Sequence, residues 1–138
     1  MLSAYSAQTL RILLALLPEL AGLVTIKGDV FEVTLTTPAG WMFWLGSDDV
    51  DYLTVGLANY HCHFGNFAGT TPEQDAADAA AFIKSLRAGE LVVVEQYRAD
   101  ELVSAWAQST TVANPSSSAS NTQFQGAADR FEVKSWNA

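Results

Sequence analysis

The sequence has a single cysteine, Cys62, among 138 residues. One cysteine cannot form a disulfide within the chain, and such usage is typical of proteins from a reducing compartment. A chain of this length can bury enough surface to fold as one domain without a cross-link. We therefore expect one domain over residues 1–138 and a cytoplasmic location.

Basic residues are scarce as well. Seven Lys and Arg stand against 15 Asp and Glu, which gives a formal net charge of −8 at pH 7 and a pI near 4.4. This charge argues against nucleic acid or an anionic membrane as a direct partner. It is compatible with a basic protein partner, although many domains are acidic merely for solubility.

The N-terminal apolar run, residues 10–18, is too short to cross a membrane. No basic side chain precedes this run, Arg11 lies inside it, and no small-residue cleavage site follows in the manner of a signal peptide. Its leucines recur at helical spacing, so we interpret it as part of a buried helix.

Motifs for nucleotide binding and nucleophilic catalysis are missing. The chain has neither a Gly-Lys-Ser/Thr phosphate loop nor a Gly-x-Gly-x-x-Gly turn, and it lacks the Gly-x-Ser-x-Gly elbow of serine hydrolases. We therefore expect a protein that is not an enzyme and has no cofactor.

Hydrophobic periodicity predicts a helix, four strands, a second helix and three strands. The first helix is expected at about 7–20 with Ser6 as its cap, and the second from Pro72 to about Ala88, with Thr71 and Gln74 forming a capping box. Strands are expected at 23–26, 30–36, 41–45, from 51 to the His-Cys-His segment, and at 91–97, 102–108 and 131–136. This order indicates an α+β fold with one antiparallel sheet of about six to seven strands and the second helix after strand four. A flexible loop is expected near 113–127.

Both histidines lie in one short segment, Tyr60-His61-Cys62-His63-Phe64. On a strand, His61 and His63 would share one face and Cys62 would point to the other. Such a pair is a candidate metal site if a carboxylate such as Asp75 or Glu73 joins it. Zinc sites use three or four ligands, and the sequence has no further His or Cys, so the same pair also fits a solvent-facing strand end.

Several segments together resemble small immunity proteins of bacterial polymorphic-toxin systems. The segments are Val55-Gly56-Leu57, the His-Cys-His-Phe run, a capped helix ending at Gly89-Glu90, a Val-rich strand and the closing Val133-Lys134-Ser135-Trp136. The resemblance covers roughly residues 40–137. In that family a His-Thr-His-Phe type segment and a terminal Ser-Trp recur; here Cys62 replaces the usual small polar residue, and Asn137 stands where a small residue often follows.

The resemblance implies a cytoplasmic antidote without catalytic activity that binds and blocks a cognate toxin domain. An acidic domain would be steered toward a basic toxin such as a nuclease. Exposed aromatic groups beside acidic ones would form the binding surface. The candidate partner-binding residues are Asp48, Asp49, Asp51, His61, His63, Glu73, Asp75, Asp78, Asp100 and Glu101. The alternative function is a small metal-dependent enzyme that uses His61 and His63.

Overall fold

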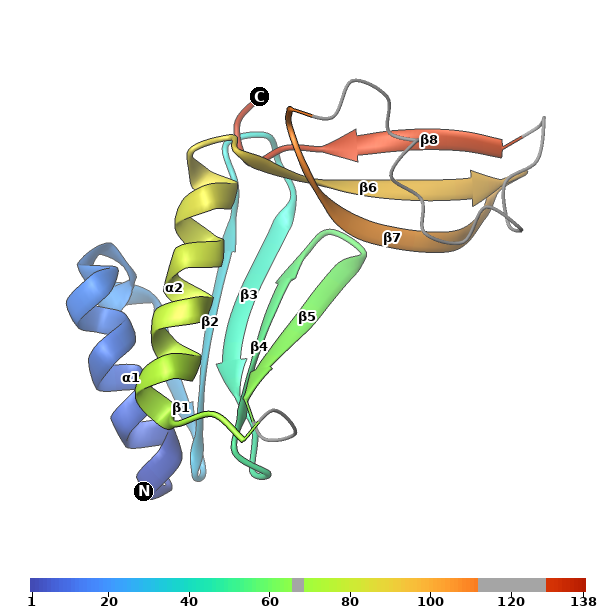
Figure 1. The fold of residues 1–138 in the computed structure, drawn as a ribbon. Helices are drawn as coiled ribbons and strands as arrows, with labels where there is room; N and C mark the ends of the chain where they lie inside the picture. The colour runs from blue at the N-terminus through green and yellow to red at the C-terminus, as the bar shows by residue number, and fades with distance from the viewer. Residues whose placement is uncertain (66–68, 112–128) are drawn as a thin grey trace.

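The protein has an α+β fold built on antiparallel sheets, as the sequence predicts. The computed structural model describes residues 1–65, 69–111 and 129–138. Its elements are α1 (Ala4–Leu16), a short 3-10 helix (Pro18–Leu23), β1 (Val24–Lys27), β2 (Val30–Thr36), β3 (Met42–Ser47), β4 (Tyr52–Leu57), β5 (Tyr60–Gly65), α2 (Pro72–Arg87), β6 (Leu91–Arg98), β7 (Glu101–Ser109) and β8 (Asp129–Lys134). Figure 1 shows how they are arranged.

The strands form two sheets rather than the single sheet expected from the sequence. The larger sheet has the order β1-β2-β3-β4-β5 and the smaller one the order β7-β6-β8, with every neighbouring pair antiparallel. The smaller sheet projects from one end of the larger one, away from the helices (Figure 1). Strand patterns specify which residues alternate, but they do not say where one sheet ends and another begins, so this division was not predictable.

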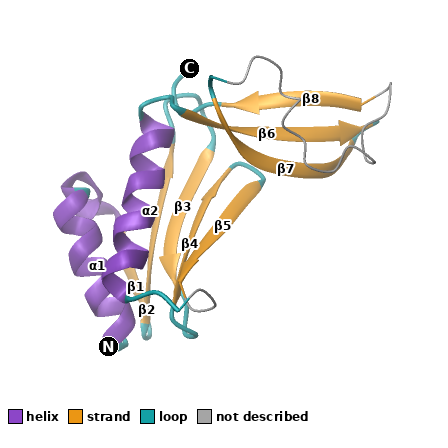
Figure 2. Cartoon of the chain, in the orientation of Figure 1, coloured by secondary structure: helices purple, strands orange, loops and turns teal. Residues whose placement is uncertain are grey.

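Helices α1 and α2 lie side by side on one face of the larger sheet (Figure 2). Strand residues of alternate positions point at them and are fully buried, and Ile83 and Leu86 of α2 and Leu13 of α1 pack against these side chains. The sheet residues of this core are Phe31, Val33, Phe43, Leu45, Leu53, Val55 and Leu57. Because side chains alternate along a strand, the residues between them point to the opposite, outer face.

The start of α2 follows the sequence prediction. Thr71 caps the helix by accepting a hydrogen bond from the Gln74 amide, and the Gln74 side chain accepts one from the Thr71 amide. Pro72 occupies the first turn, where its missing N–H costs nothing. The capping box therefore fixes where α2 begins.

The predicted bounds of α1 were wrong at both ends. Ser3, not Ser6, is the N-cap, and its hydroxyl accepts from the Ser6 amide. Ser6 is buried inside the helix, with its hydroxyl 2.7 Å from that of Ser47. The helix ends at Leu16 because a residue that precedes proline, here Leu17 before Pro18, is disfavoured in the helical conformation.

The His-Cys-His segment belongs to its own strand, which corrects the expected strand order. A turn at Ala58 and Asn59 separates β4 from β5, so α2 follows the fifth strand rather than the fourth. Ala58 adopts a left-handed φ of 53°. Neither residue is a Gly or Pro, so the turn carries no strong local signal.

Glu95 and Trp136 both help to join the smaller sheet to the larger one. The buried carboxylate of Glu95, on β6, accepts a 3.0 Å hydrogen bond from the Asn59 amide in the β4–β5 turn. Trp136, just beyond β8, packs edge-on against Phe43 at a centroid distance of 5.1 Å. The terminal Ser-Trp motif thus contributes its tryptophan to the core. The loop expected near 113–127 lies outside the described residues.

Among the described residues, no helix is long and apolar enough to cross a membrane.

Candidate functional site

The outer face of the larger sheet gathers aromatic and imidazole side chains. The pairing of β3, β4 and β5 places Trp44, Gly56 and His61 in one row and Thr54 and His63 in the next. Tyr52 lies at the start of β4 on the same face. Both helices cover the other face (Figure 2). We call the five side chains of Trp44, Tyr52, Thr54, His61 and His63 the outer-face patch.

The two histidines share a face, as their spacing predicts. Their rings are exposed and meet edge-on with centroids 5.2 Å apart. The His63 ring also packs edge-on against Tyr52 at 4.8 Å, and its Nδ1 atom lies 2.9 Å from the Thr54 hydroxyl. These contacts hold the His63 ring in one orientation, while His61 projects from the end of the row.

Trp44 lies flat over β4 because Gly56 has no side chain. A Cβ atom at Gly56 would overlap the indole ring of Trp44. Gly56 is itself buried beneath this ring, while Trp44 stays partly exposed. The indole therefore fills the space over Gly56, on the strand that lies between Trp44 and His61. Sequence reasoning anticipated exposed aromatic groups in the binding surface but did not identify Trp44.

An acidic turn adjoins the outer-face patch at Asp48, Asp49 and Asp51. Asp48 accepts a 3.2 Å hydrogen bond from the Val50 amide, and Asp49 and Asp51 are exposed. A hydrogen bond with the Asp49 carboxyl group lowers the pKa of Asp48, and the same contact raises the pKa of Asp49. Desolvation and then a hydrogen bond with Asp48 raise the pKa of Tyr52.

Tyr52 therefore joins the acidic turn to the histidines. Its hydroxyl interacts with Asp48 and its ring contacts His63, which contacts His61. These contacts thus join four of the sequence-based candidates on one surface: Asp48, Asp49, His61 and His63. Asp51 is exposed in the same turn. Tyr52 was missed because alternation alone does not distinguish an exposed aromatic residue from a buried one.

Asp75 cannot belong to a binding surface, although the sequence suggested it. Its side chain is only 2% exposed and accepts a 2.7 Å hydrogen bond from the Tyr5 hydroxyl and another from Thr70. Gly65 makes room for it, since a Cβ atom there would overlap the carboxylate. Asp75 is a structural group at the start of α2.

The other acids of α2 remain exposed. Glu73 accepts a hydrogen bond from the Gln8 side chain of α1, and Asp78 lies one turn further along the helix. Neither is on the outer face of the sheet, because α2 covers the inner one. They form a separate acidic surface near the helix start.

Asp100 and Glu101 are exposed at the turn between β6 and β7. This turn is the far tip of the smaller sheet (Figure 1). The structure therefore does not bring this pair together with the outer-face patch.

The third ligand that a metal site needs was not found where the sequence suggested it. Asp75 is buried in the helical layer and Glu73 is bonded to Gln8, so neither reaches His61 and His63. Within residues 1–65, 69–111 and 129–138, no three His, Cys, Asp or Glu side chains form a group that could hold a metal ion.

Cys62 points to the inner side of β5, opposite the histidines. Burial raises the pKa of its thiol, and a hydrogen bond with Tyr60 opposes this shift only in part. Reactive cysteines have lowered pKa values, because the thiolate is the nucleophile. Cys62 therefore has the environment of a structural thiol.

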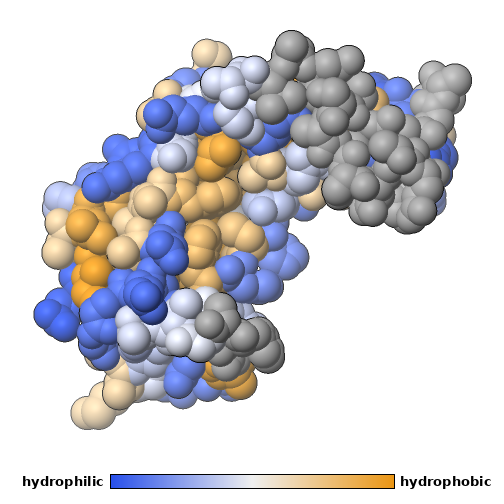
Figure 3. Space-filling model, in the orientation of Figure 1, coloured by the Kyte–Doolittle hydropathy of each residue, from blue (hydrophilic) through white to orange (hydrophobic). Residues whose placement is uncertain are grey.

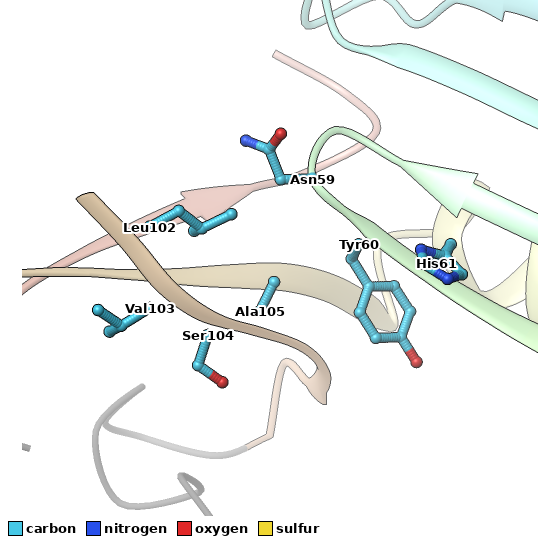
Figure 4. A pocket seen from close by; sticks show the side chains of 7 residues that line it. All are labelled: Asn59, Tyr60, His61, Leu102, Val103, Ser104 and Ala105. Atoms are coloured by element: carbon cyan, nitrogen blue, oxygen red, sulfur yellow. The ribbon is translucent and has the colours of Figure 1, made fainter. Parts of the chain in front are cut away.

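A shallow pocket lies where the two sheets meet (Figure 4). Its volume is about 260 Å³, and its walls come from the β4–β5 turn, the start of β5 and β7. The lining residues are Asn59, Tyr60, His61, Leu102, Val103, Ser104 and Ala105. Sequence reasoning did not find this pocket because it depends on how the two sheets meet.

Comparison of the chain with protein-family models, with curated proteins and with solved structures finds no match.

Proposed function

We propose that this chain is an immunity protein, which binds a cognate bacterial toxin domain and blocks it without catalysing a reaction. The observation that carries the proposal is the continuous surface of the outer-face patch and the acidic turn. Partly exposed Trp44 and Tyr52 are of the residue types that dominate binding energy in protein interfaces. The sequence resemblance to immunity proteins of polymorphic-toxin systems points the same way.

Charge supports a basic partner, such as a nuclease toxin. A net charge of −8 attracts a basic domain at long range and accelerates association. Asp49 and Asp51 lie at the margin of the outer-face patch, where exposed charges act on the association rate. The partner would be neutralised in the cytoplasm, the compartment that a single unpaired cysteine favours.

Co-expression tests this proposal. An immunity gene should lie immediately downstream of its toxin gene, so the product of the gene immediately upstream would be expressed alone and together with this chain, and cell growth measured. We expect growth to stop with the toxin alone and to recover when both are present. A harmless upstream product, or toxicity that persists undiminished, would contradict the proposal.

A further inference from the structure

Strand β5 is an edge of the larger sheet. In the part of the chain that the structure describes, the only strand that pairs with it is β4. An antiparallel edge strand has backbone N–H and C=O groups of alternate residues directed away from the sheet. A two-residue turn closes on a hydrogen-bonded pair, here Leu57 and Tyr60, so the outward groups are those of His61 and His63.

The inner side of this edge is apolar and incompletely covered. Leu53, Val55 and Leu57 on β4 are fully buried, whereas their β5 partners Phe64, Cys62 and Tyr60 are only half-buried. Figure 3 shows hydrophobic surface between α2 and β5.

Phe82 of α2 continues this apolar strip beyond β5. Its ring lies 5.9 Å from Phe64 and 6.5 Å from Tyr60, measured between centroids. One further strand beside β5 would place alternate side chains over Phe82, in line with the inner rows of the sheet.

Acidic groups flank the strip. Asp78 precedes Phe82 by four residues, so the two side chains lie on the same side of α2, and Asp78 is exposed. Asp51 adjoins Tyr52, which pairs with Gly65 at the end of β5. A second copy of this chain would bring a further net charge of −8 to the same edge, so like-charge repulsion disfavours a second copy as the occupant. A basic segment, by contrast, is attracted to this acidic surface.

We propose that the free edge of β5 receives an extended segment of the toxin partner as an additional strand. Apolar side chains of that segment cover Tyr60, Phe64 and Phe82 on the inner side, and the basic ones that alternate with them lie on the outer side of the sheet. The segment's end at the β4–β5 turn places a side chain in the pocket between Tyr60 and Leu102. Main-chain hydrogen bonds supply affinity and the alternate side chains supply specificity. The identity of the partner rests on the proposed function, but the edge is testable without it.

A synthetic peptide of alternating character, acetyl-Lys-Val-Lys-Val-Lys-Val-Lys-amide, is the probe. Added at millimolar concentration to the full chain, it should slow amide exchange at His61 and His63 several-fold, as followed by NMR. The matched peptides carry Glu in place of Lys, or Pro in place of the central Val, and should have little effect. Unchanged exchange with the Lys peptide, or equal slowing by the Pro peptide, would overturn the proposal.

Two proline variants test whether the peptide effect requires the β5 edge or is lost whenever a strand of the sheet is disturbed. Proline is tolerated where an edge-strand N–H points to solvent, so His61→Pro should fold yet lose the peptide effect. Ile26→Pro on β1, the opposite edge of the same sheet, should fold and keep it. Loss of the effect in both variants, or in neither, would contradict the assignment to β5. So would a dimer of the free chain that His61→Pro abolishes, because the edge would then serve a second copy.

The toxin domain distinguishes this inference from the proposed function. If the toxin is neutralised while the β5 amides exchange as in the free chain, the immunity function stands and the edge proposal fails. If the Lys peptide protects β5 but the upstream product is harmless, the edge stands and the immunity function fails.

Discussion

The Tyr5 hydroxyl donates a 2.7 Å hydrogen bond to the buried carboxylate of Asp75, and so links the start of α1 to the start of α2. The Asp75 carboxylate also accepts from Thr70, so it has partners from two directions. A buried charged acceptor that loses a donor carries an uncompensated desolvation cost. The contact therefore determines how firmly the two helices are joined at this end.

Removing the Tyr5 hydroxyl should destabilise the protein. We expect Tyr5→Phe to lower the free energy of unfolding by about 1 to 3 kcal/mol, because Asp75 loses a buried donor. Urea denaturation measures the change. As a control, Tyr52→Phe should cost less, because the Tyr52 hydroxyl interacts with Asp48, a partly exposed acceptor that water can reach.

The same variant should change how stability depends on alkaline pH. Burial first, and then the hydrogen bond with Asp75, raise the pKa of Tyr5 in the folded protein. The stability that this shift contributes is fully present below about pH 10, the unfolded pKa, and is lost as the pH rises toward the folded pKa. Above about pH 10 the wild-type chain should therefore lose stability more steeply than Tyr5→Phe. Parallel declines would count against this linkage.

A methyl group at Gly56 should displace Trp44. We expect Gly56→Ala to cost about 1 to 3 kcal/mol, because the new Cβ atom would overlap the indole ring. The tryptophan emission spectrum should shift at the same time. Gly22→Ala is the matched control, since a Cβ atom there meets nothing within 4 Å. Equal stability of the two variants would mean that Trp44 does not lie on Gly56.

Two alanines occupy turn positions that suit glycine. Ala58 and Ala99 have φ values of 53° and 55° at the first central residue of two-residue turns, where the β1–β2 turn has Gly28. Relief of the left-handed strain should outweigh the entropy that glycine adds, so Ala58→Gly and Ala99→Gly should each stabilise by about 0.5 to 1 kcal/mol. Ala77→Gly, on the exposed side of α2, should destabilise by about 1 kcal/mol. Thermal and urea denaturation would show these opposite signs.

If the proposed immunity function holds, toxin binding should depend on the outer-face patch and its neighbouring acids. Asp49→Lys combined with Asp51→Lys should slow association and weaken its salt dependence, because charges at an interface margin act mainly on the association rate. Asp100→Lys with Glu101→Lys makes the same change in net charge at the far tip and should have a smaller effect. Stopped-flow or surface-binding kinetics compare the two. Equal slowing would show that only the total charge matters.

Truncation of an aromatic side chain tests whether the outer-face patch contacts the toxin domain. Trp44→Ala should weaken binding of the toxin domain at least about thirtyfold, a loss of about 2 kcal/mol, if Trp44 is a dominant contact. Dissociation should become faster while association changes little. Trp106→Ala, in the smaller sheet, is the comparison variant. A toxin complex indifferent to Trp44→Ala would move the interface away from the outer-face patch.

Local sequence signals predicted much of this fold. Thr71, Pro72 and Gln74 specify where α2 begins, and the alternation in residues 30–36 specifies both the strand and its buried face. Those signals act within a few residues of each other. The turn at Ala58 lacks such a signal. The surrounding strands and the hydrogen bond to Glu95 hold its backbone instead, and these contacts come from distant parts of the sequence.

The candidate site was predictable only in part. The His61 and His63 spacing was sufficient to place both rings on one face. The burial of Asp75 depends on Tyr5, which lies 70 residues away in the sequence. The contact between Tyr52 and His63 likewise depends on strand register, which no local pattern fixes.

The hydrogen bond from Asn59 to Glu95 has a thermodynamic consequence for recognition. It attaches the turn that leads into β5 to the middle strand of the smaller sheet, and Glu95 also lies 3.9 Å from Lys134 on the neighbouring strand. The orientation between β5 and β7 is therefore set when the protein folds. A partner that contacts both strands meets a preorganised surface. Less conformational entropy is therefore lost on binding, and more of the contact energy appears as affinity.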